Sequence, residues 1–284
     1  MSAPPLFRVA DDRRVSVVRD VTEVQQVFEE DPVGTCMVAA RIGASGLDPA
    51  TMGGELWTRS RSSESLCFAG ANLVPMRGTD ADLRAFADKA MSVPRRCSSL
   101  VGRTELVMPM WQQLEPVWGP AREVRDCQPL LTLTDPPMCP MDPAVRPVRM
   151  DELDVYLIAA VAMFIGEVGI DPRMGDGGRG YRRRVAGLIA AGRAWARFED
   201  GEVVFKAEIG AQTPTVGQIQ GVWVHPDWRG QGLGAAGTAT LAAAVLRSGR
   251  TPSLYVNDFN VAARATYHRI GFVQLGTYAT VLLD

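Results

Sequence analysis

Lysine is scarce in this chain of 284 residues, where Lys89 and Lys206 are the only lysines among 30 basic side chains. Arginine supplies the remaining positive charge, and 32 acidic residues bring the formal net charge to −2. A nearly neutral chain has no general electrostatic attraction for nucleic acid or for an anionic membrane. We therefore expect no nucleic acid and no membrane among its partners.

Long apolar runs are also missing, since none reaches the roughly 18 residues that a membrane-spanning helix needs. The segment from Met1 to Pro5 lacks the basic stretch and apolar core of a secretory signal. Hydrophobic residues make up 46% of the chain and charged residues 22%, which is typical of a soluble globular protein. These features predict a cytoplasmic location.

Cysteine and histidine are too few and too scattered for a disulfide framework or a metal site. The five cysteines are an odd number at wide spacing, and no C-x-x-C pair occurs among them. All five precede residue 140, whereas both histidines follow it. This uneven distribution predicts two structural units and no bound metal.

A proline-rich segment separates the two predicted units. Residues 135–143 contain four prolines in nine positions, and proline at this density excludes helix and interior strand. We predict a first domain at 1–134, a semi-rigid linker at 135–144 and a second domain at 145–284.

The stretch over residues 217–237 is the part of the sequence that is most informative about chemistry. An apolar run over 218–224 predicts a strand, His225-Pro226 ends it, and an Ala-rich helix is expected over 233–247. Four glycines lie in and just after the turn between them, beside Arg229. Glycine permits close backbone approach and a helix N-terminus offers unpaired amides, so this turn favours binding of a phosphate or pyrophosphate.

One alternative ligand is a dinucleotide. Gly232-x-Gly234-x-x-Gly237 matches the G-x-G-x-x-G pattern, and Asp258 follows about twenty residues later. In that class of site the glycines come directly after the strand, but here residues 225–231 intervene. Only 47 residues follow Gly237, which is too few for the further βα units of such a fold. A NAD-binding oxidoreductase is therefore the third of three functional alternatives.

A second pattern fits the same stretch better. The motif R-x-x-G-x-G over 229–234 resembles the acetyl-CoA pyrophosphate loop of the GNAT acetyltransferase superfamily. About 30 residues later, N-x-x-A-x-x-x-Y-x-x-x-G-F over 260–272 resembles the second conserved segment of that family. The resemblance is clearest over 145–284. It implies an α/β (α+β) fold with a mixed sheet, the acyl-CoA N-acyltransferase (GNAT) fold.

The first unit has a similar order of elements but weaker motifs. We expect strands over 35–42, 55–60 and 65–73, and a helix begins at Thr79. Residues 71–80 take the place of the phosphate loop, yet they contain one glycine, and Asp80 with Asp82 repels a pyrophosphate. We interpret residues 1–134 as a degenerate GNAT-like copy that does not bind acetyl-CoA. An unrelated α+β domain is the open alternative.

The resemblance implies that the second unit takes acetyl-CoA as its cosubstrate. In this family the pantetheine arm lies against the strand before the loop, and the Val224 N–H is expected near the thioester carbonyl. Asn260 is expected to contact coenzyme A, to cap the last helix, or both. The predicted cofactor-binding residues are Val222, Trp223, Val224, Arg229, Gly230, Gln231, Gly232, Leu233, Gly234, Ala235, Asn257, Asn260 and Tyr267.

The resemblance also implies that Tyr267 is the general acid. A phenol pKa of about 10 is close to that of a departing thiol, although core packing is the alternative role. The general base is open, because Gln218 and Gln220 lie where many family members carry a glutamate, and an amide cannot take a proton. Glu208 on the preceding strand and Glu167 beside a glycine-rich loop are the two candidates.

The sequence thus predicts an N-acetyltransferase that moves an acetyl group from acetyl-CoA to a primary amine by direct attack in a ternary complex. The alternative from another class is a non-catalytic acyl-CoA-binding sensor, which the missing strand glutamate favours. Three successive arginines at 182–184 fit either an acidic acceptor or a solvated helix face. The acceptor, whether a small amine or a peptide or protein amine, stays open, as does the oligomeric state.

Overall fold

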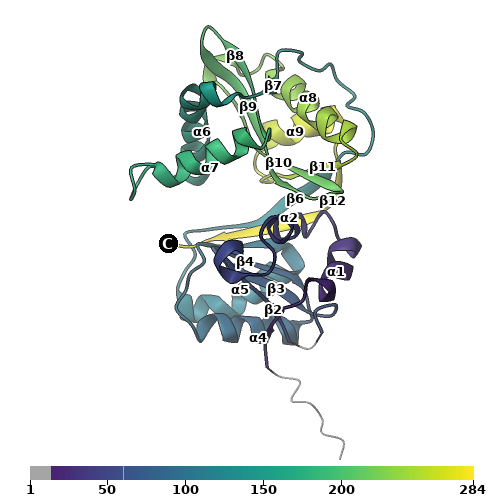
Figure 1. The fold of residues 1–284 in the computed structure, drawn as a ribbon, viewed down its shortest axis with the longest axis vertical. Coiled ribbons are helices and arrows are strands. Elements are labelled where there is room, and N and C mark those ends of the chain that lie inside the picture. Colours follow the sequence, from purple (N-terminus) through teal and green to yellow (C-terminus); the bar gives the residue numbers. More distant parts are fainter. Residues whose placement is uncertain (1–13, 60) are drawn as a thin grey trace, which may run out of the picture. The chain divides into compact units, whose positions relative to one another are not determined.

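The structure, a computed structural model, describes residues 14–59 and 61–284 and is shown in Figure 1. It divides into two compact units, one of residues 1–128 with 277–284 and the other of residues 129–276. This division differs from the predicted boundaries at 134 and 145. Residues 129–134 belong to the second unit, and residues 277–284 belong to the first.

The first unit is built on a sheet in which β1–β2, β2–β3, β3–β4 and β5–β12 pair antiparallel and β4–β5 pair parallel. Its strands are β1 (Ser16–Val17), β2 (Gly54–Thr58), β3 (Leu66–Gly70), β4 (Asn72–Arg77), β5 (Ser99–Arg103), the start of β6 (Glu123–Thr132) and the end of β12 (Val273–Leu282). Its helices are η1 (Val21–Glu23), α1 (Gln25–Glu30), α2 (Cys36–Ser45), α3 (Pro49–Met52), α4 (Asp80–Met91) and α5 (Thr104–Trp118). Residues of α4 and α5 form one core cluster with the sheet.

Two predictions for the first unit are wrong. Residues 35–42 were expected to form a strand, but α2 covers Cys36–Ser45 and buries Cys36, Val38 and Ile42. Residues 71–80 do not form a loop, because β4 occupies most of them. The helix start at Thr79 is confirmed, since Thr79 and Asp82 form a reciprocal capping box at the start of α4.

The second unit contains a sheet in the order β6-β11-β10-β9-β8-β7. Besides the end of β6, its strands are β7 (Arg146–Pro147), β8 (Ala194–Glu199), β9 (Glu202–Gln212), β10 (Val216–Val224) and β11 (Thr251–Tyr255). Its helices are η2 (Met150–Glu152), α6 (Leu153–Val168), α7 (Arg179–Ala190), η3 (Pro226–Trp228), α8 (Leu233–Arg247) and α9 (Val261–Ile270). No helix in the described ranges is long and apolar enough to cross a membrane.

Helices cover both faces of this second sheet, with α6 and α7 on one face and α8 and α9 on the other (Figure 1). Strand β9 lies between the two layers, so its side chains are buried almost without alternation. Two core clusters result, one around Tyr156 and Val185 beneath α6 and α7, and one around Phe205 and Leu241 beneath α8. A charged side chain on β9 therefore has to find its partners inside the protein.

Strands β6 and β12 each begin in one unit and end in the other. Residues 278–282 of β12 pair antiparallel with β5 in the first unit. Residues 130–132 of β6 pair antiparallel with β11 in the second unit. Each unit therefore includes the end of a strand from the other half of the sequence.

The proline-rich segment has no helix or strand, as predicted, but it is packed against the second unit. The Met138 amide donates to the Ile270 carbonyl at 2.9 Å. Asp142 is buried, and its carboxylate pairs with Arg197 at 2.9 Å. The segment therefore belongs to the second unit and does not act as a free spacer.

Candidate functional site

Strands β10 and β11 run parallel but pair only where they begin. Residues 216–218 lie opposite residues 251–253, and within the described ranges the pairing ends there although both strands continue. Beyond Gln218 the β11-facing edge of β10 therefore has no strand partner. Unpaired backbone groups at such an edge are able to take up an extended ligand.

The amide of Val224 is directed toward this open edge. Trp223 pairs with Lys206 on β9, and the His225 amide donates to the Val204 carbonyl at 2.9 Å. The backbone groups of residues 223 and 225 thus face β9, and alternation along a strand turns those of Val224 the other way. The side chains of Val222 and Val224 pack against the cluster under α8, whereas Trp223 packs on the opposite face of the sheet.

A run of unpaired amides follows at the start of α8. The amides of residues 230–234 donate no hydrogen bond to any described residue, whereas the next one, Ala235, donates to the Gly232 carbonyl at 3.1 Å. Gly230 and Gly232 have φ values of 76° and 83°, a region in which side chains other than glycine are strained. These glycines turn the chain so that unpaired amides gather at the positive end of a 15-residue helix.

Two side chains hold the turn that carries these amides. Arg229 donates from Nε to the Val224 carbonyl at 3.2 Å, and Gln231 donates from Nε2 to the Asp227 carbonyl at 3.3 Å. Arg229 is exposed, so its guanidinium adds a positive charge next to the unpaired amides. The whole arrangement is suited to an anion such as a pyrophosphate.

The predicted second motif lies on α9. Asn260 accepts a hydrogen bond from the Ala263 amide at 3.1 Å, which confirms its role as the cap of that helix. Asn257 is half-buried just after β11. Tyr267 is buried, and its ring meets Phe272 edge to face at 6.0 Å between centroids. Burial, and then the negative charge of Glu167, raise the pKa of Tyr267, so its hydroxyl is protonated at neutral pH.

Glu208 lies in a buried charged cluster on β9. Its carboxylate is 2.9 Å from the Lys206 ammonium, accepts a hydrogen bond from the Tyr156 hydroxyl at 3.2 Å, and is 3.8 Å from Arg184. The side chains of Lys206 and Glu208 are both 0% exposed. Burial opposes ionisation of Glu208, but the charges of Lys206 and Arg184 outweigh it and keep its pKa below the usual value. The cluster is therefore an ion pair.

The two candidate bases thus differ in their surroundings. Glu208 has lost contact with solvent, and its oxygens are already engaged, which disfavours proton abstraction from an incoming amine. Glu167 is exposed near the C-terminal end of α6. Burial raises the pKa values of Tyr181 and Tyr267, and the charge of Glu167 adds to the rise in both. Glu167 is therefore accessible from solvent, whereas Glu208 is not.

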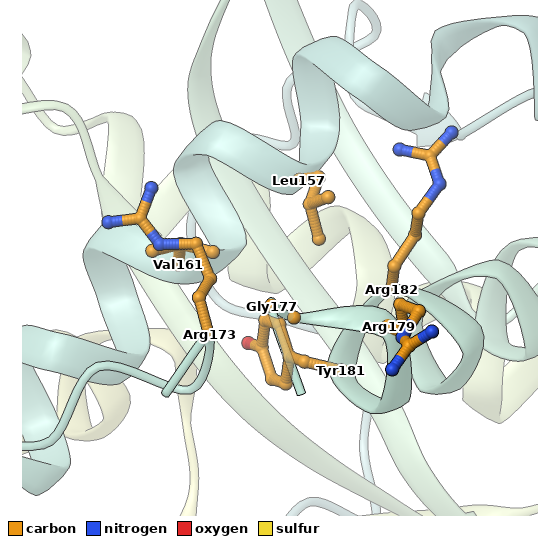
Figure 2. Close-up of a pocket in the computed structure, with 8 residues that line it drawn as sticks. Leu157, Val161, Arg173, Gly177, Arg179, Tyr181 and Arg182 are labelled. Carbon is orange, nitrogen blue, oxygen red and sulfur yellow. The ribbon is translucent and has the colours of Figure 1, made fainter. Parts of the chain in front are cut away.

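A cavity of about 230 Å³ opens between α6, α7 and the glycine-rich loop that joins them. Figure 2 shows apolar and aromatic side chains in its middle and three guanidinium groups around them. The lining side chains are Leu157, Val161, Tyr181, Arg173, Arg179 and Arg182. Arg173 pairs with Asp171 at 2.7 Å, and Arg182 pairs with Asp154. These pairings reduce the positive charge at the rim, so the cavity is mainly apolar.

The sequence interpretation did not assign three residues that the structure brings together, namely Lys206, Tyr156 and Gly221. Lys206 donates to the Gly221 carbonyl at 3.0 Å, and Tyr156 reaches Glu208 from α6. The available signal was the spacing of Lys206 and Glu208, because residues two apart in a strand share one face.

Two family models match parts of the chain. Residues 206–281 match a family described as FR47-like protein, and residues 54–156 match a domain of unknown function, DUF4081. No curated protein matches the chain.

Solved structures resemble nearly the whole chain. A GNAT-family acetyltransferase from Colwellia psychrerythraea is 11% identical, with a TM-score of 0.57 over 95% of this chain and 100% of that one. A Drosophila protein is 11% identical, with a TM-score of 0.66 over 95% and 98%. A GCN5-related N-acetyltransferase from Kribbella flavida is 16% identical, with a TM-score of 0.53 over 87% and 95%. The fold is therefore that of the GNAT acyltransferases, as the resemblance of the two sequence motifs implied.

Proposed function

We propose that this protein is an N-acetyltransferase that moves an acetyl group from acetyl-CoA to a primary amine. The observation that carries the proposal is the run of unpaired amides at residues 230–234, next to the open edge of β10. A pyrophosphate satisfies these amides and is attracted by Arg229 and by the helix dipole. An extended pantetheine arm fits the edge that β11 leaves free.

In this proposal the Val224 amide donates to the thioester carbonyl oxygen and stabilises the negative charge that develops there. The amine nitrogen attacks the carbonyl carbon, the new N–C bond forms and the C–S bond breaks. The departing sulfur takes a proton from Tyr267, and the attacking nitrogen loses a proton to Glu167. We favour Glu167 over Glu208 because the carboxylate of Glu208 is buried and paired with Lys206.

The cavity between α6 and α7 supports a proposal for the acceptor. Its middle is apolar, and two of its arginines already pair with aspartates. Within the run 182–184, Arg182 pairs with Asp154 and Arg184 lies near Glu208. An acceptor amine that carries an apolar group therefore fits better than one that carries several negative charges.

The test is release of free coenzyme A from acetyl-CoA with a panel of primary amines matched in length but differing in apolar and acidic groups. We expect turnover with apolar amines, a loss of about 10²-fold or more in Glu167→Gln, and a similar loss in Tyr267→Phe. Calorimetry measures acetyl-CoA binding separately. Binding without turnover on any amine favours the acyl-CoA sensor, and binding of NAD but not of acetyl-CoA contradicts both readings.

A further inference from the structure

Strand β10 contains a bulge immediately before its open edge. Gln220 pairs with Glu208 and pairing resumes with Trp223 opposite Lys206, so two residues of β10 face a single residue of β9. The first of the two, Gly221, has a φ of 59°. Such a bulge bends the strand and leaves backbone groups without a ladder partner.

Lys206 supplies a hydrogen-bond donor to a backbone carbonyl of the bulge. Its ammonium nitrogen donates to the Gly221 carbonyl at 3.0 Å. The contact is tight, because a Cβ added at Gly221 would lie 3.0 Å from that nitrogen and 3.0 Å from the Met163 methyl group. The ammonium therefore fills the space beneath the bulge, and glycine is required there for both conformation and room.

The position of the ammonium is itself fixed from several sides. Glu208 lies 2.9 Å away, and the Tyr156 ring centroid lies 5.5 Å from the lysine nitrogen. The Glu208 carboxylate is in turn held by Tyr156 and by Gln220, whose Nε2 is 3.5 Å from it. A lysine that is 0% exposed has little freedom to move away from the carbonyl it binds.

We infer that Lys206 is a positioning residue for the acyl-CoA site, because it fixes the Gly221 bulge and thereby the direction of the Val224 amide three residues later. The inference rests on the proposed function and deepens it. Glu208 then serves as the partner that keeps this lysine in place. The competing role is simple core stabilisation, which has no effect on ligand binding once the protein is folded.

The decisive variant removes the lysine without leaving a buried unpaired carboxylate. Lys206→Met alone strands the Glu208 charge inside the protein and is expected to unfold it. The double variant Lys206→Met/Glu208→Gln removes both charges. Glu208→Gln alone is the matched control, because burial lowers the pKa of Lys206 and a neutral amine still donates to the Gly221 carbonyl. Thermal unfolding establishes that the double variant and its control are folded.

Two measurements distinguish a role of Lys206 in positioning the bulge from a role in stabilising the core. Calorimetry gives the Kd for acetyl-CoA and for adenosine 3′,5′-bisphosphate, which lacks the pantetheine arm. We expect the double variant to bind acetyl-CoA about tenfold more weakly than Glu208→Gln, with unchanged affinity for the bisphosphate. Hydrogen exchange of the unliganded protein, resolved to peptides over 218–225, is expected to be faster in the double variant.

Equal acetyl-CoA affinity and equal exchange in the two variants would overturn the inference. An equal loss of affinity for acetyl-CoA and for the bisphosphate would also overturn it, since the damage is then not confined to the bulge. If the wild-type protein does not bind acetyl-CoA, the proposed function fails, and the hydrogen-exchange comparison alone decides whether Lys206 fixes the bulge.

Discussion

The hydroxyl of Tyr156 donates a hydrogen bond to the Glu208 carboxylate at 3.2 Å, and both side chains are completely buried. Hydrogen bonds to charged groups stabilise proteins more than neutral ones do. We expect Tyr156→Phe to lower the free energy of unfolding by about 1.5–3 kcal/mol in urea titrations. Tyr181→Phe is the matched control, because Tyr181 donates to the neutral Ala160 carbonyl at 3.0 Å and should cost only about 1 kcal/mol. Equal losses in the two variants would contradict a charged Glu208.

A glycine of the loop before α8 can be compared with a glycine that follows the other end of the same helix. Gly232 at the start of α8 and Gly249 just past its end have φ values of 83° and 76°, and a Cβ meets nothing within 4 Å at either position. Substitution by alanine should therefore cost similar backbone strain, about 1–2 kcal/mol. We expect Gly232→Ala alone to raise the Kd for acetyl-CoA, by about tenfold, because only its loop carries the unpaired amides. Calorimetry and thermal unfolding of both variants test this, and equal affinities would exclude the loop as the anion site.

Asn260 has one confirmed role and one predicted role. Asn260→Ala removes the cap of α9 and should lower the free energy of unfolding by about 1 kcal/mol. Asn260→Ser keeps a capping oxygen and should restore most of that stability. If the serine variant is as stable as wild type yet binds acetyl-CoA more weakly, the side chain also contacts the ligand. An unchanged Kd in both variants would limit Asn260 to the cap.

Glu152 should make stability depend on pH in the acid range. The hydrogen bond from Arg146, at 2.6 Å, is the main cause that lowers the pKa of Glu152 from 4.5 to about 2. A depressed folded-state pKa stabilises the protein above pH 4.5, and this contribution is lost as the pH falls toward 2.

The corresponding variant is Glu152→Gln, which keeps an oxygen for the Arg149 amide. Because Arg146 is 40% exposed, we expect a loss of only about 1–2 kcal/mol at pH 7, shrinking as the pH falls from 4.5 toward 3. Urea unfolding at pH 7 and pH 3 measures both values. A difference that does not change with pH would show that the ion pair contributes nothing.

The glycine motif shows which features can be predicted from the sequence alone and which cannot. The helix predicted over 233–247 matches α8 at both ends, because its glycine start and alanine-rich body are local signals. The literal dinucleotide match has a packing cause, since a Cβ at Gly237 would lie 2.6 Å from the Phe205 ring. Close contact between helix and strand requires glycine there in either kind of fold.

Other features could not be predicted from the sequence, because they depend on contacts between distant parts of the chain. The apolar run at 35–42 was compatible with a strand or a buried helix, and short runs of this kind are not distinguished by periodicity. The ion pair of Lys206 with Glu208 was visible as two charges on one strand face, but its burial depends on helices that cover both faces of β9. Strands β6 and β12 each begin in one unit and end in the other, and they pair with strands more than 100 residues away in the sequence. No local pattern encodes such pairings.

The pairing of β12 with β5 also constrains the order in which the protein folds during synthesis. Strand β5 of the first unit receives its neighbour from residues 278–282, which leave the ribosome after every residue of the second unit. Domains usually fold as they emerge, N-terminal domain first. Here the sheet of the first unit stays incomplete until residues 278–282 have been synthesised. The first unit therefore cannot complete its folding before the second unit has been synthesised, although either half has enough residues to form a domain.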